Sequence, residues 1–403
     1  MSRQPLLQRT ATPFAFSLTG LPFTFAIFLS SVVFADGLPR AKPESVGMRD
    51  DRLARISDVV AEGLSKKKMP GCVVTIGRRG RIVYQKAFGF RQLEPDRVPM
   101  TVDTVFDLAS LTKPIATATS AMILFERGDL RMRDRVSEYV PSFANSGKEA
   151  ATIEDLLTHQ AGLIPDNALA DYRDGRAAAF QNIYALKAMY PPQSRFVYSD
   201  VGFVLLDDII ERVSGSNVDQ FSKRHLFAPL GMHETGFLPP ETLRARAAAT
   251  ERRDGHWMKG EVHDPRAFAM GGVAGHAGLF STSNDLAIYA QMMLQGGEYG
   301  GNRILSRATV DLMTSPRRIV EGQKVSLRGL GWDKRTGYSS NRGENMSPRA
   351  YGHGGFTGTV LWIDPEHDLF FLFLSNRVHP AGKGSVNRLA GRIATIAISS
   401  IDD

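Results

Sequence analysis

The sequence predicts an α/β (α+β) fold in which both ends of the chain build one antiparallel sheet and a mostly helical region is inserted between them. Two pairs of strand-like runs carry this prediction: residues 72–77 with 82–89, and residues 358–364 with 369–375. A short polar turn joins the two runs of each pair, as in a β-hairpin. Between the pairs, over about residues 110–315, the pattern is mostly helical with long loops. We therefore expect the two termini to share the sheet.

Apolar residues at helical spacing predict one helix before the first strand pair and another after the last. The first apolar face consists of Leu53, Ile56, Val59, Val60 and Leu64, and the last consists of Val386, Leu389, Ile393 and Ile396. These two helices are expected to flank the sheet. The sequence has a single cysteine, Cys72, which lies in the first apolar strand run and is interpreted as a core residue.

The first 35 residues have the pattern of a secretory signal. Arg3 and Arg9 precede an apolar stretch over residues 21–29, and small or apolar residues then lead to Ala35. We expect cleavage after Ala35 and a periplasmic or secreted mature protein. The alternative is an uncleaved membrane anchor, which the glycine and proline in the apolar region disfavour.

The charge of the chain is moderately basic and evenly spread. The sequence has 49 Lys and Arg against 42 Asp and Glu, and residues 1–35 hold two of the arginines and no acid. The remaining surplus is scattered in short clusters, which argues against a nucleic-acid partner and is compatible with association with anionic cell-wall polymers. The overall composition, 43% hydrophobic and 23% charged, is typical of a soluble globular protein.

The motif Ser110-Leu-Thr-Lys113 opens the helical region. It places a hydroxyl and an amine one helical turn apart, beside the free N–H groups of a helix start. Such an arrangement suits a covalent serine nucleophile whose proton passes to a neighbouring base. The chain also contains Ser65-Lys-Lys-Lys68, but three adjacent lysines cannot all be desolvated, so this second match is interpreted as a solvated helix end.

Two further segments place chemically useful side chains near turns. In Tyr198-Ser-Asp200 the tyrosine lies between a loop and a helix start, where a nearby ammonium would ease its ionisation; the alternative is a packed ring with Asp200 as the helix N-cap. The glycine-rich segment 351–358 carries His353 and allows close approach of backbone to a ligand, so that its N–H groups could help form an oxyanion hole. The alternative there is a tight turn with a surface histidine.

The histidines of the central region are candidates for a metal site. His256, His263, Asp264 and His276 lie within about twenty residues of one another. They lack the helical or short Cys/His spacings typical of metal ligands, so we interpret them as loop and hydrogen-bonding residues and predict no metal.

Together, the three segments are similar to the serine β-lactamase-like and penicillin-binding protein family. That family carries Ser-x-x-Lys, then Tyr-x-Asn, then Lys-Thr-Gly or His-Thr-Gly, and the chain has the matching segments in the same order. The resemblance extends over about residues 40–400 and includes residues 156–163, 229–232 and 271–281, the last of which is similar to a periplasmic esterase-like subgroup. It implies a β-lactamase/transpeptidase-like fold with one hydrolase domain over 40–400 and its helical insertion at about 110–315.

The resemblance also implies roles for the first two segments. Ser110 would be the acylated nucleophile, and Lys113 and Tyr198 would share the transfer of its proton. The Lys113 ammonium is expected to favour the tyrosinate form of Tyr198, while burial is expected to lower the pKa of Lys113 itself.

For substrate binding, the remaining positions include two departures from the family pattern, Asp200 and Gly354. Asp200 stands where the family often has asparagine, and His353 replaces the lysine of the third segment. Gly354 lacks the hydroxyl that helps bind a substrate carboxylate, and Gly355 matches the final glycine. The N–H groups of Ser110 and Phe356 would form the oxyanion hole.

The sequence therefore predicts an exported, cofactor-free serine hydrolase that cleaves an ester or a peptide amide through an acyl-enzyme on Ser110. The expected substrate is a small ester or a peptidoglycan peptide. Because Asp200 and Gly354 disfavour a substrate carboxylate, true β-lactamase or DD-carboxypeptidase activity is the alternative. A penicillin-binding sensor module that is acylated and never turns over is the alternative outside enzymes.

Overall fold

The computed structural model describes residues 37–382 and 384–402. The predicted secretory signal at residues 1–35 lies outside this part of the chain. Within it, no helix combines the length and the apolar character that a membrane crossing requires.

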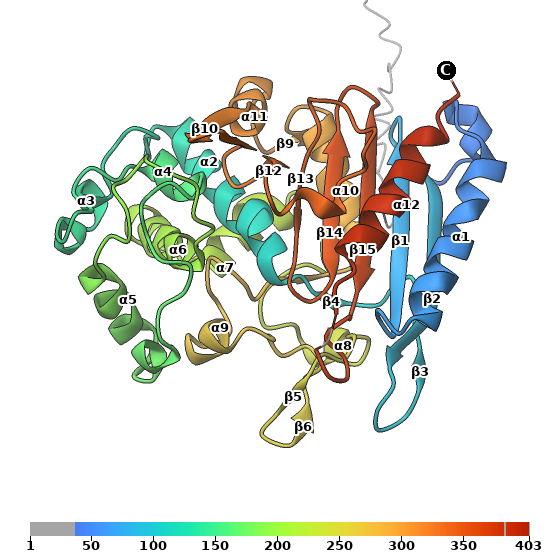
Figure 1. Ribbon diagram of the computed structural model, residues 1–403, viewed down its shortest axis with the longest axis horizontal. Coiled ribbons are helices and arrows are strands. Elements are labelled where there is room, and N and C mark those ends of the chain that lie inside the picture. Colours follow the sequence, from blue (N-terminus) through green and yellow to red (C-terminus); the bar gives the residue numbers. More distant parts are fainter. Residues whose placement is uncertain (1–36, 383, 403) are drawn as a thin grey trace, which may run out of the picture. The chain divides into compact units, whose positions relative to one another are not determined.

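One antiparallel sheet organises the described residues (Figure 1). It has nine strands there, in the order β10-β11-β12-β13-β14-β15-β1-β2-β3. Strand β1 pairs along its whole length with β15, from Cys72 opposite Ser375 to Arg78 opposite Leu369, so the predicted sharing of the sheet by both ends of the chain is confirmed. The strands are β1 (Gly71–Arg78), β2 (Arg81–Gln92), β3 (Val98–Pro99), β10 (Arg317–Glu321), β11 (Lys324–Arg328), β12 (Asp333–Arg335), β13 (Tyr351–Gly354), β14 (Thr359–Asp364) and β15 (Leu369–Ser375).

The sequence predicts four of these strands, β1, β2, β14 and β15, and misses β3 at one edge and β10 to β13 at the other. Strands β10 to β12 are short and rich in charged residues, so they lack the apolar alternation that marks a strand. The glycine-rich segment was expected to precede a strand, but residues Tyr351–Gly354 themselves form β13, paired with β14. Glycine weakens a strand pattern in the sequence without preventing backbone pairing.

Helices α1 (Asp50–Ser65) and α12 (Asn387–Ser399) cover one face of the sheet, as predicted (Figure 1). Alternation along each central strand divides the apolar residues between the two faces. On β15, Phe371 and Phe373 pack toward these two helices, whereas Phe370, Leu372 and Leu374 pack toward the helical region. Cys72 is buried in the apolar core between the sheet and helices α1 and α12.

The helical region lies against the other face of the sheet. Its helices are α2 (Thr119–Arg127), α3 (Val136–Tyr139), α4 (Ile153–Leu157), α5 (Gly175–Ala185), α6 (Asp200–Ser214), α7 (Val218–Ser222), α8 (Glu241–Arg244), α9 (Pro265–Ala269), α10 (Ser283–Leu294) and α11 (Arg307–Thr314). Three short strand pairs accompany them: β4 (Phe106–Asp107) with β7 (Phe280–Ser281), β5 (Arg252–Arg253) with β6 (His256–Trp257), and β8 (Glu298–Tyr299) with β9 (Asn302–Arg303).

The two Ser-x-x-Lys segments have opposite surroundings. The segment after Ser110 is a buried helix, as predicted, although it begins with a 3-10 turn (Ala109–Leu111) and a π-helical turn (Lys113–Ala118) before α2. Ser65 ends α1, and the three lysines that follow it are exposed. The interpretation of that second match as a solvated helix end is confirmed.

Candidate active site

Ser110 follows a strained turn at the end of β4. Ala109, immediately before it, has a φ of 45°, an uncommon left-handed value for a residue with a side chain. The Asp107 carboxylate stabilises this turn, because it accepts the backbone N–H of Ala109 at 2.8 Å and that of His263 at 2.7 Å. Burial raises the pKa of Asp107. The turn leaves Ser110 partly exposed at the end of an otherwise buried segment.

The turn between β13 and β14 supports the Ser110 segment from the other side. The Thr357 hydroxyl donates to the Asp107 carbonyl at 2.7 Å, and the Thr359 hydroxyl donates to the Leu108 carbonyl at 3.0 Å. A Cβ on Gly355 would collide with that same Leu108 carbonyl oxygen. The close approach expected at these glycines is therefore, at Gly355, an approach to the backbone that carries Ser110.

Lys113 is completely buried and lies at the centre of the site. Its ammonium donates to Ser110 Oγ at 3.1 Å and to the His276 carbonyl at 3.0 Å, and it pairs with Asp200 Oδ1 at 2.5 Å. Burial alone lowers the pKa of Lys113, but the Asp200 carboxylate and the Tyr198 phenol raise it more, so the pKa is above its ordinary value. The predicted lowering is wrong because Asp200 supplies a full negative charge where an asparagine would not.

Asp200 is the first residue of α6. The N-cap of this helix is Ser199, whose Oγ accepts the Gly202 N–H at 3.2 Å, so the alternative in which Asp200 caps the helix is wrong. The Asp200 side chain instead reaches Lys113. A carboxylate at a helix N-terminus is also favoured by the helix dipole.

Tyr198 is packed among aromatic rings beside the Lys113 ammonium, which lies 5.1 Å from its ring centroid. Ring centroids of His159, Tyr338 and His353 lie 4.5, 5.0 and 5.9 Å away. Burial raises the pKa of Tyr198, and the lowering by Lys113 does not offset it. The expectation of a tyrosinate is therefore wrong for this state of the site, and Tyr198 is a neutral phenol.

His159 holds the Tyr198 segment in place. Its Nδ1 accepts the Ser199 N–H at 3.1 Å, and its carbonyl accepts the Val197 N–H at 3.0 Å. The motif at residues 156–163 thus shapes the site.

His353 is buried, so the alternative of a surface histidine is wrong. Its Nδ1–H donates to the Gly354 carbonyl at 2.9 Å, and burial holds the pKa of the imidazole well below its usual range. The His353 imidazole is therefore neutral, whereas a lysine at this position would bring a positive charge.

Arg328 supplies positive charge near His353 and was missed by the sequence analysis. It is fully buried on β11, and its Nε and Nη2 have no hydrogen-bond partner among the described residues. The nearest carboxylate oxygen, on Asp333, is 3.9 Å from Nη1. Because β11 was not predicted, no local pattern placed this guanidinium near Ser110.

Asn341 occupies the space beside Gly354. A Cβ on Gly354 would lie 2.5 Å from Asn341 Nδ2, while Asn341 Oδ1 accepts the Trp362 indole N–H at 3.0 Å. Gly354 has no side-chain hydroxyl, but the Asn341 amide lies close to the place where such a side chain would be and carries an N–H donor.

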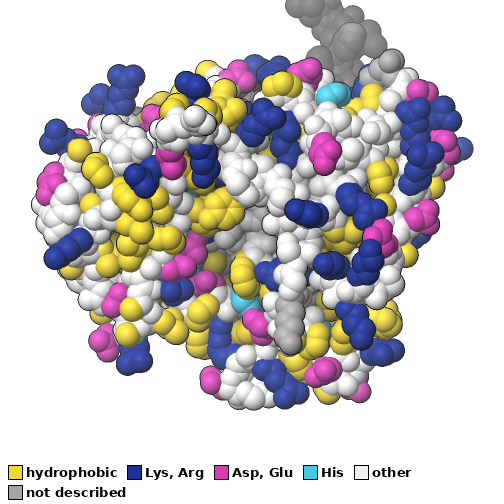
Figure 2. Space-filling model, in the orientation of Figure 1, with side chains coloured by type: hydrophobic (Ala, Val, Ile, Leu, Met, Phe, Trp, Pro, Cys, Tyr) yellow, Lys and Arg dark blue, Asp and Glu magenta, His cyan; other side chains and the backbone are white. Residues whose placement is uncertain are grey.

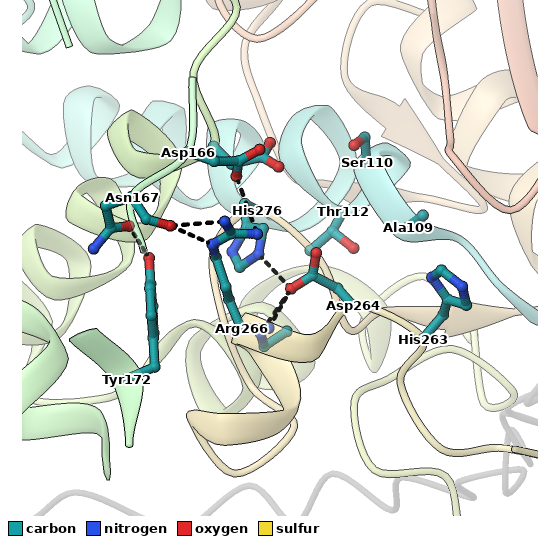
Figure 3. Close-up of polar contacts among 12 residues, drawn as sticks. Ala109, Ser110, Thr112, Asp166, Asn167, Tyr172, His263, Asp264, Arg266 and His276 are labelled. Atoms are coloured by element: carbon teal, nitrogen blue, oxygen red, sulfur yellow. Dashed lines mark hydrogen bonds and ion pairs between the residues drawn. The ribbon is translucent and has the colours of Figure 1, made fainter. Parts of the chain in front are cut away.

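His276 and Asp264 form a second ion pair beside Lys113. His276 Nε2 lies 3.0 Å from Asp264 Oδ1, and Asp264 also caps α9 through the N–H groups of Arg266 and Ala267 (Figure 3). Burial lowers the pKa of His276, but Asp264 raises it more, so the net pKa is raised. His276 is thus a hydrogen-bonding histidine, as interpreted from the sequence.

Among the described residues, one group of side chains could hold a metal ion. Single ligand atoms of Asp200, Asp264 and His276 lie within 4.8 Å of one another. Two of these groups are already matched, however, since Asp200 pairs with Lys113 and Asp264 pairs with His276. The local charges are therefore balanced by the protein's own side chains.

Two cavities meet at Ser110. Their volumes are about 820 Å³ and 240 Å³, and both are lined by Ser110, Tyr198, Tyr338 and Phe356. Figure 2 shows the surface hollowed between the helical region and the sheet. The larger cavity is rich in paired charges, and its further lining residues include Asp166, Glu251, Arg253 and Arg266. The smaller cavity contains free hydrogen-bond donors, and its further lining residues include Arg328, Asn341, His353 and Arg377.

Comparison with known proteins agrees with this architecture. The Beta-lactamase family model matches residues 56–395. The chain is 33% identical over 381 residues to a protein of Escherichia coli O157:H7 described as a putative D-alanyl-D-alanine carboxypeptidase, covering 85% of this chain and 86% of the relative. It is 32% identical over 415 residues to an N-acetylmuramyl-L-alanine amidase of Bacillus subtilis (strain 168), covering 92% of each.

Among solved structures, a penicillin-binding protein homologue from Caulobacter crescentus shares the fold. The TM-score is 0.70 at 22% sequence identity, with 88% of this chain and 99% of that chain covered. The extent of the family match, the two relatives and the shared fold lead to one conclusion: the chain belongs to the beta-lactamase family and is a serine hydrolase of the β-lactamase fold.

Proposed function

We propose that this protein hydrolyses an ester or a peptide amide through an acyl-enzyme on Ser110, and that peptidoglycan peptides are its natural substrate class. The observation that carries the proposal is the position of Lys113, a buried ammonium 3.1 Å from Ser110 Oγ and fixed by Asp200 and the His276 carbonyl. A charged group in hydrogen-bond contact with a partly exposed serine hydroxyl is the arrangement expected of an activated nucleophile.

The charge states of the site point to a proton relay through Tyr198. Lys113 is an ammonium and Tyr198 a phenol, so neither is a free base at rest. As Ser110 Oγ bonds to the substrate carbonyl carbon, its proton passes to Tyr198 Oη. Tyr198 gives its own proton to the leaving nitrogen or oxygen while the bond to that atom breaks. Lys113 stays protonated and stabilises the negative charge that develops between the two oxygens.

The rest of the cycle uses the same groups. The N–H groups of Ser110 and Phe356 are assigned to the oxyanion of the tetrahedral intermediate. Water then enters in place of the leaving group, gives a proton to Tyr198 as it attacks the ester carbonyl, and Tyr198 returns a proton to Ser110.

The names of the two relatives favour peptide amides within this class. One is described as a putative D-alanyl-D-alanine carboxypeptidase and the other as an N-acetylmuramyl-L-alanine amidase, so both names refer to an amide bond next to alanine. A polymer substrate outside the cell also fits the predicted export signal. The same residues could also hydrolyse an ester, because the alcohol of an ester is a better leaving group than the amine of an amide.

A labelling and turnover experiment tests the proposal. The mature protein is treated with a fluorophosphonate probe and a fluorescent penicillin, and hydrolysis is then measured on p-nitrophenyl esters, a D-Ala-D-Ala peptide, N-acetylmuramyl-L-alanyl peptides and nitrocefin. We expect labelling and turnover of an ester or a peptide. Penicillin labelling with no turnover of any substrate would establish the sensor alternative, and turnover confined to nitrocefin would establish a β-lactamase.

Tyr198→Phe is expected to lower the rate of acylation by at least about 10²-fold, because the relay loses the oxygen that accepts and donates the proton. Pre-steady-state labelling with the fluorophosphonate probe measures this rate. Tyr338→Phe is the matched control, since it alters another tyrosine of the same cavity walls and should leave acylation within a few-fold of wild type. Equal acylation by Tyr198→Phe and wild type would make Tyr198 a packing residue.

Arg328→Met is expected to lower kcat/KM for a substrate with a free carboxylate by at least about tenfold, the value of one hydrogen bond to a charged group. A neutral p-nitrophenyl ester should be affected much less. The control is Arg377→Met, because Arg377 lines the same cavity but already donates to the Gly384 carbonyl at 2.9 Å. Equal losses for the two substrates would show that Arg328 only supports the fold.

A further inference from the structure

A third cavity of about 470 Å³ lies away from Ser110. It is formed by the C-terminal part of α10, by α11, by β12 and by the start of β13, elements that lie together in Figure 1. As described, it shares no lining residue with the two cavities at Ser110. Its apolar lining is Met293, Leu294, Val310, Pro316, Pro348 and Pro365.

Lys334 is a buried ammonium in the wall of this cavity. Its Nζ donates to the Arg349 carbonyl at 3.0 Å, and among the described residues it has no carboxylate within ion-pair distance. Burial, together with Arg342 and Arg349, lowers the pKa of Lys334 to about 8. An ammonium has three N–H donors, so two of them remain to be satisfied, and a buried charge without a counter-ion is costly.

The nearby carboxylate of Asp364 does not fill this role. It raises the pKa of Lys334 by less than burial, Arg342 and Arg349 together lower it. Its two oxygens accept the Ser347 N–H and hydroxyl and approach the ring of His367.

Tyr351 contributes a second unsatisfied donor. It is 1% exposed, lines the same cavity, and its hydroxyl has no hydrogen-bond partner among the described residues. Burial raises the pKa of Tyr351 well above its usual range, so the hydroxyl keeps its proton. A buried ammonium and a buried O–H in one cavity both require an acceptor.

The edge of the cavity, like Lys334 inside it, carries mostly positive charge. Arg307 and Arg349 are exposed lining residues, and Asp311, also exposed, is the only acid among the described residues of the lining. With Lys334, the lining carries three cations and one anion. Such a surplus attracts an anion and disfavours a cationic ligand.

We propose that this cavity is a binding site for a small ligand with an oxyanion group, a carboxylate or a phosphate, whose oxygens accept hydrogen bonds from Lys334 and Tyr351. The apolar lining would contact the rest of the ligand. The proposal does not depend on the proposed hydrolysis. Two strands nevertheless join this cavity to the smaller cavity at Ser110. On β12, Lys334 follows Asp333, which lines the smaller cavity, and on β13, Tyr351 lies two residues before His353.

Thermal unfolding of the intact protein tests the proposal, with inorganic phosphate or butyrate as the probe and chloride at equal ionic strength as the reference. In wild type we expect a saturable rise of Tm with one or both probes, since a ligand that binds only the folded state stabilises it. A saturable rise of Tm with only one of the two probes would identify the preferred oxyanion. No saturable rise above chloride with either probe would overturn the proposal.

Three variants locate the binding. Lys334→Met should abolish the rise, and Tyr351→Phe should weaken the apparent affinity by up to about tenfold, the loss of one hydrogen bond. Lys68→Met, which alters an exposed lysine at the end of α1, should behave as wild type. Lys334→Met removes a buried unpaired charge, so it is expected to fold. An unchanged rise in both Lys334→Met and Tyr351→Phe would contradict the site.

Discussion

Replacing Ser110 by alanine is expected to abolish hydrolysis of every substrate that the wild-type protein turns over, by at least about 10⁴-fold in kcat. Without Oγ no acyl-enzyme can form, and the Lys113 ammonium and the Tyr198 phenol have no nucleophile to act on. Steady-state kinetics on the best ester or peptide measures the loss, and intact mass after fluorophosphonate treatment shows whether the protein is still acylated.

The chain supplies its own control for this prediction. Ser65 belongs to the second Ser-x-x-Lys segment, which ends α1 beside three exposed lysines. Ser65→Ala should keep wild-type activity and labelling. Labelling that persists in Ser110→Ala, or activity within tenfold of wild type, would place the nucleophile elsewhere.

Lys113→Ala is expected to lower acylation by at least about 10²-fold and to destabilise the protein by about 3 kcal/mol. The catalytic loss follows from the missing ammonium beside Ser110 Oγ. The loss of stability follows from Asp200, whose carboxylate would remain in a mostly enclosed site without its partner at 2.5 Å; because Asp200 is 21% exposed, we take the low end of the usual range. Urea unfolding measures the free energy of unfolding.

Asp200→Asn separates the two effects. In the Lys113→Ala background it removes the unpaired charge, so it should recover much of the stability and none of the activity. In the wild-type background it removes the carboxylate that raises the pKa of Lys113, and burial then lowers that pKa. The rate profile against pH should therefore show an ionisation at lower pH than in wild type. An identical profile, or no gain of stability in the double variant, would mean that the ion pair does not set the charge of Lys113.

The central strand pairs and the two flanking helices were predictable because their signals are local. Alternating apolar residues and a polar turn specify the pairs β1–β2 and β14–β15, and apolar spacing specifies α1 and α12. The edge strands β10 to β12 carry no such pattern, since they are short, charged and partly solvated. Their pairing depends on the neighbouring strand, which sequence periodicity does not describe.

The candidate site divides in the same way. The proximity of Ser110 and Lys113 follows from their spacing on one helix. By contrast, Arg328 and Asn341 reach the site from segments that the sequence reading left unassigned.

The sequence by itself determined the strand pairs β1–β2 and β14–β15, the helices α1 and α12, the Ser110–Lys113 pair and the order of the three motif segments, because these depend on residues close together in the chain. Only the tertiary structure decided the charges of the site. Lys113 is an ammonium and Tyr198 a phenol because Asp200, the His276 carbonyl and a set of aromatic rings meet around them from distant segments. A pKa depends on burial and on distances between charges, and those distances exist only once the chain has folded.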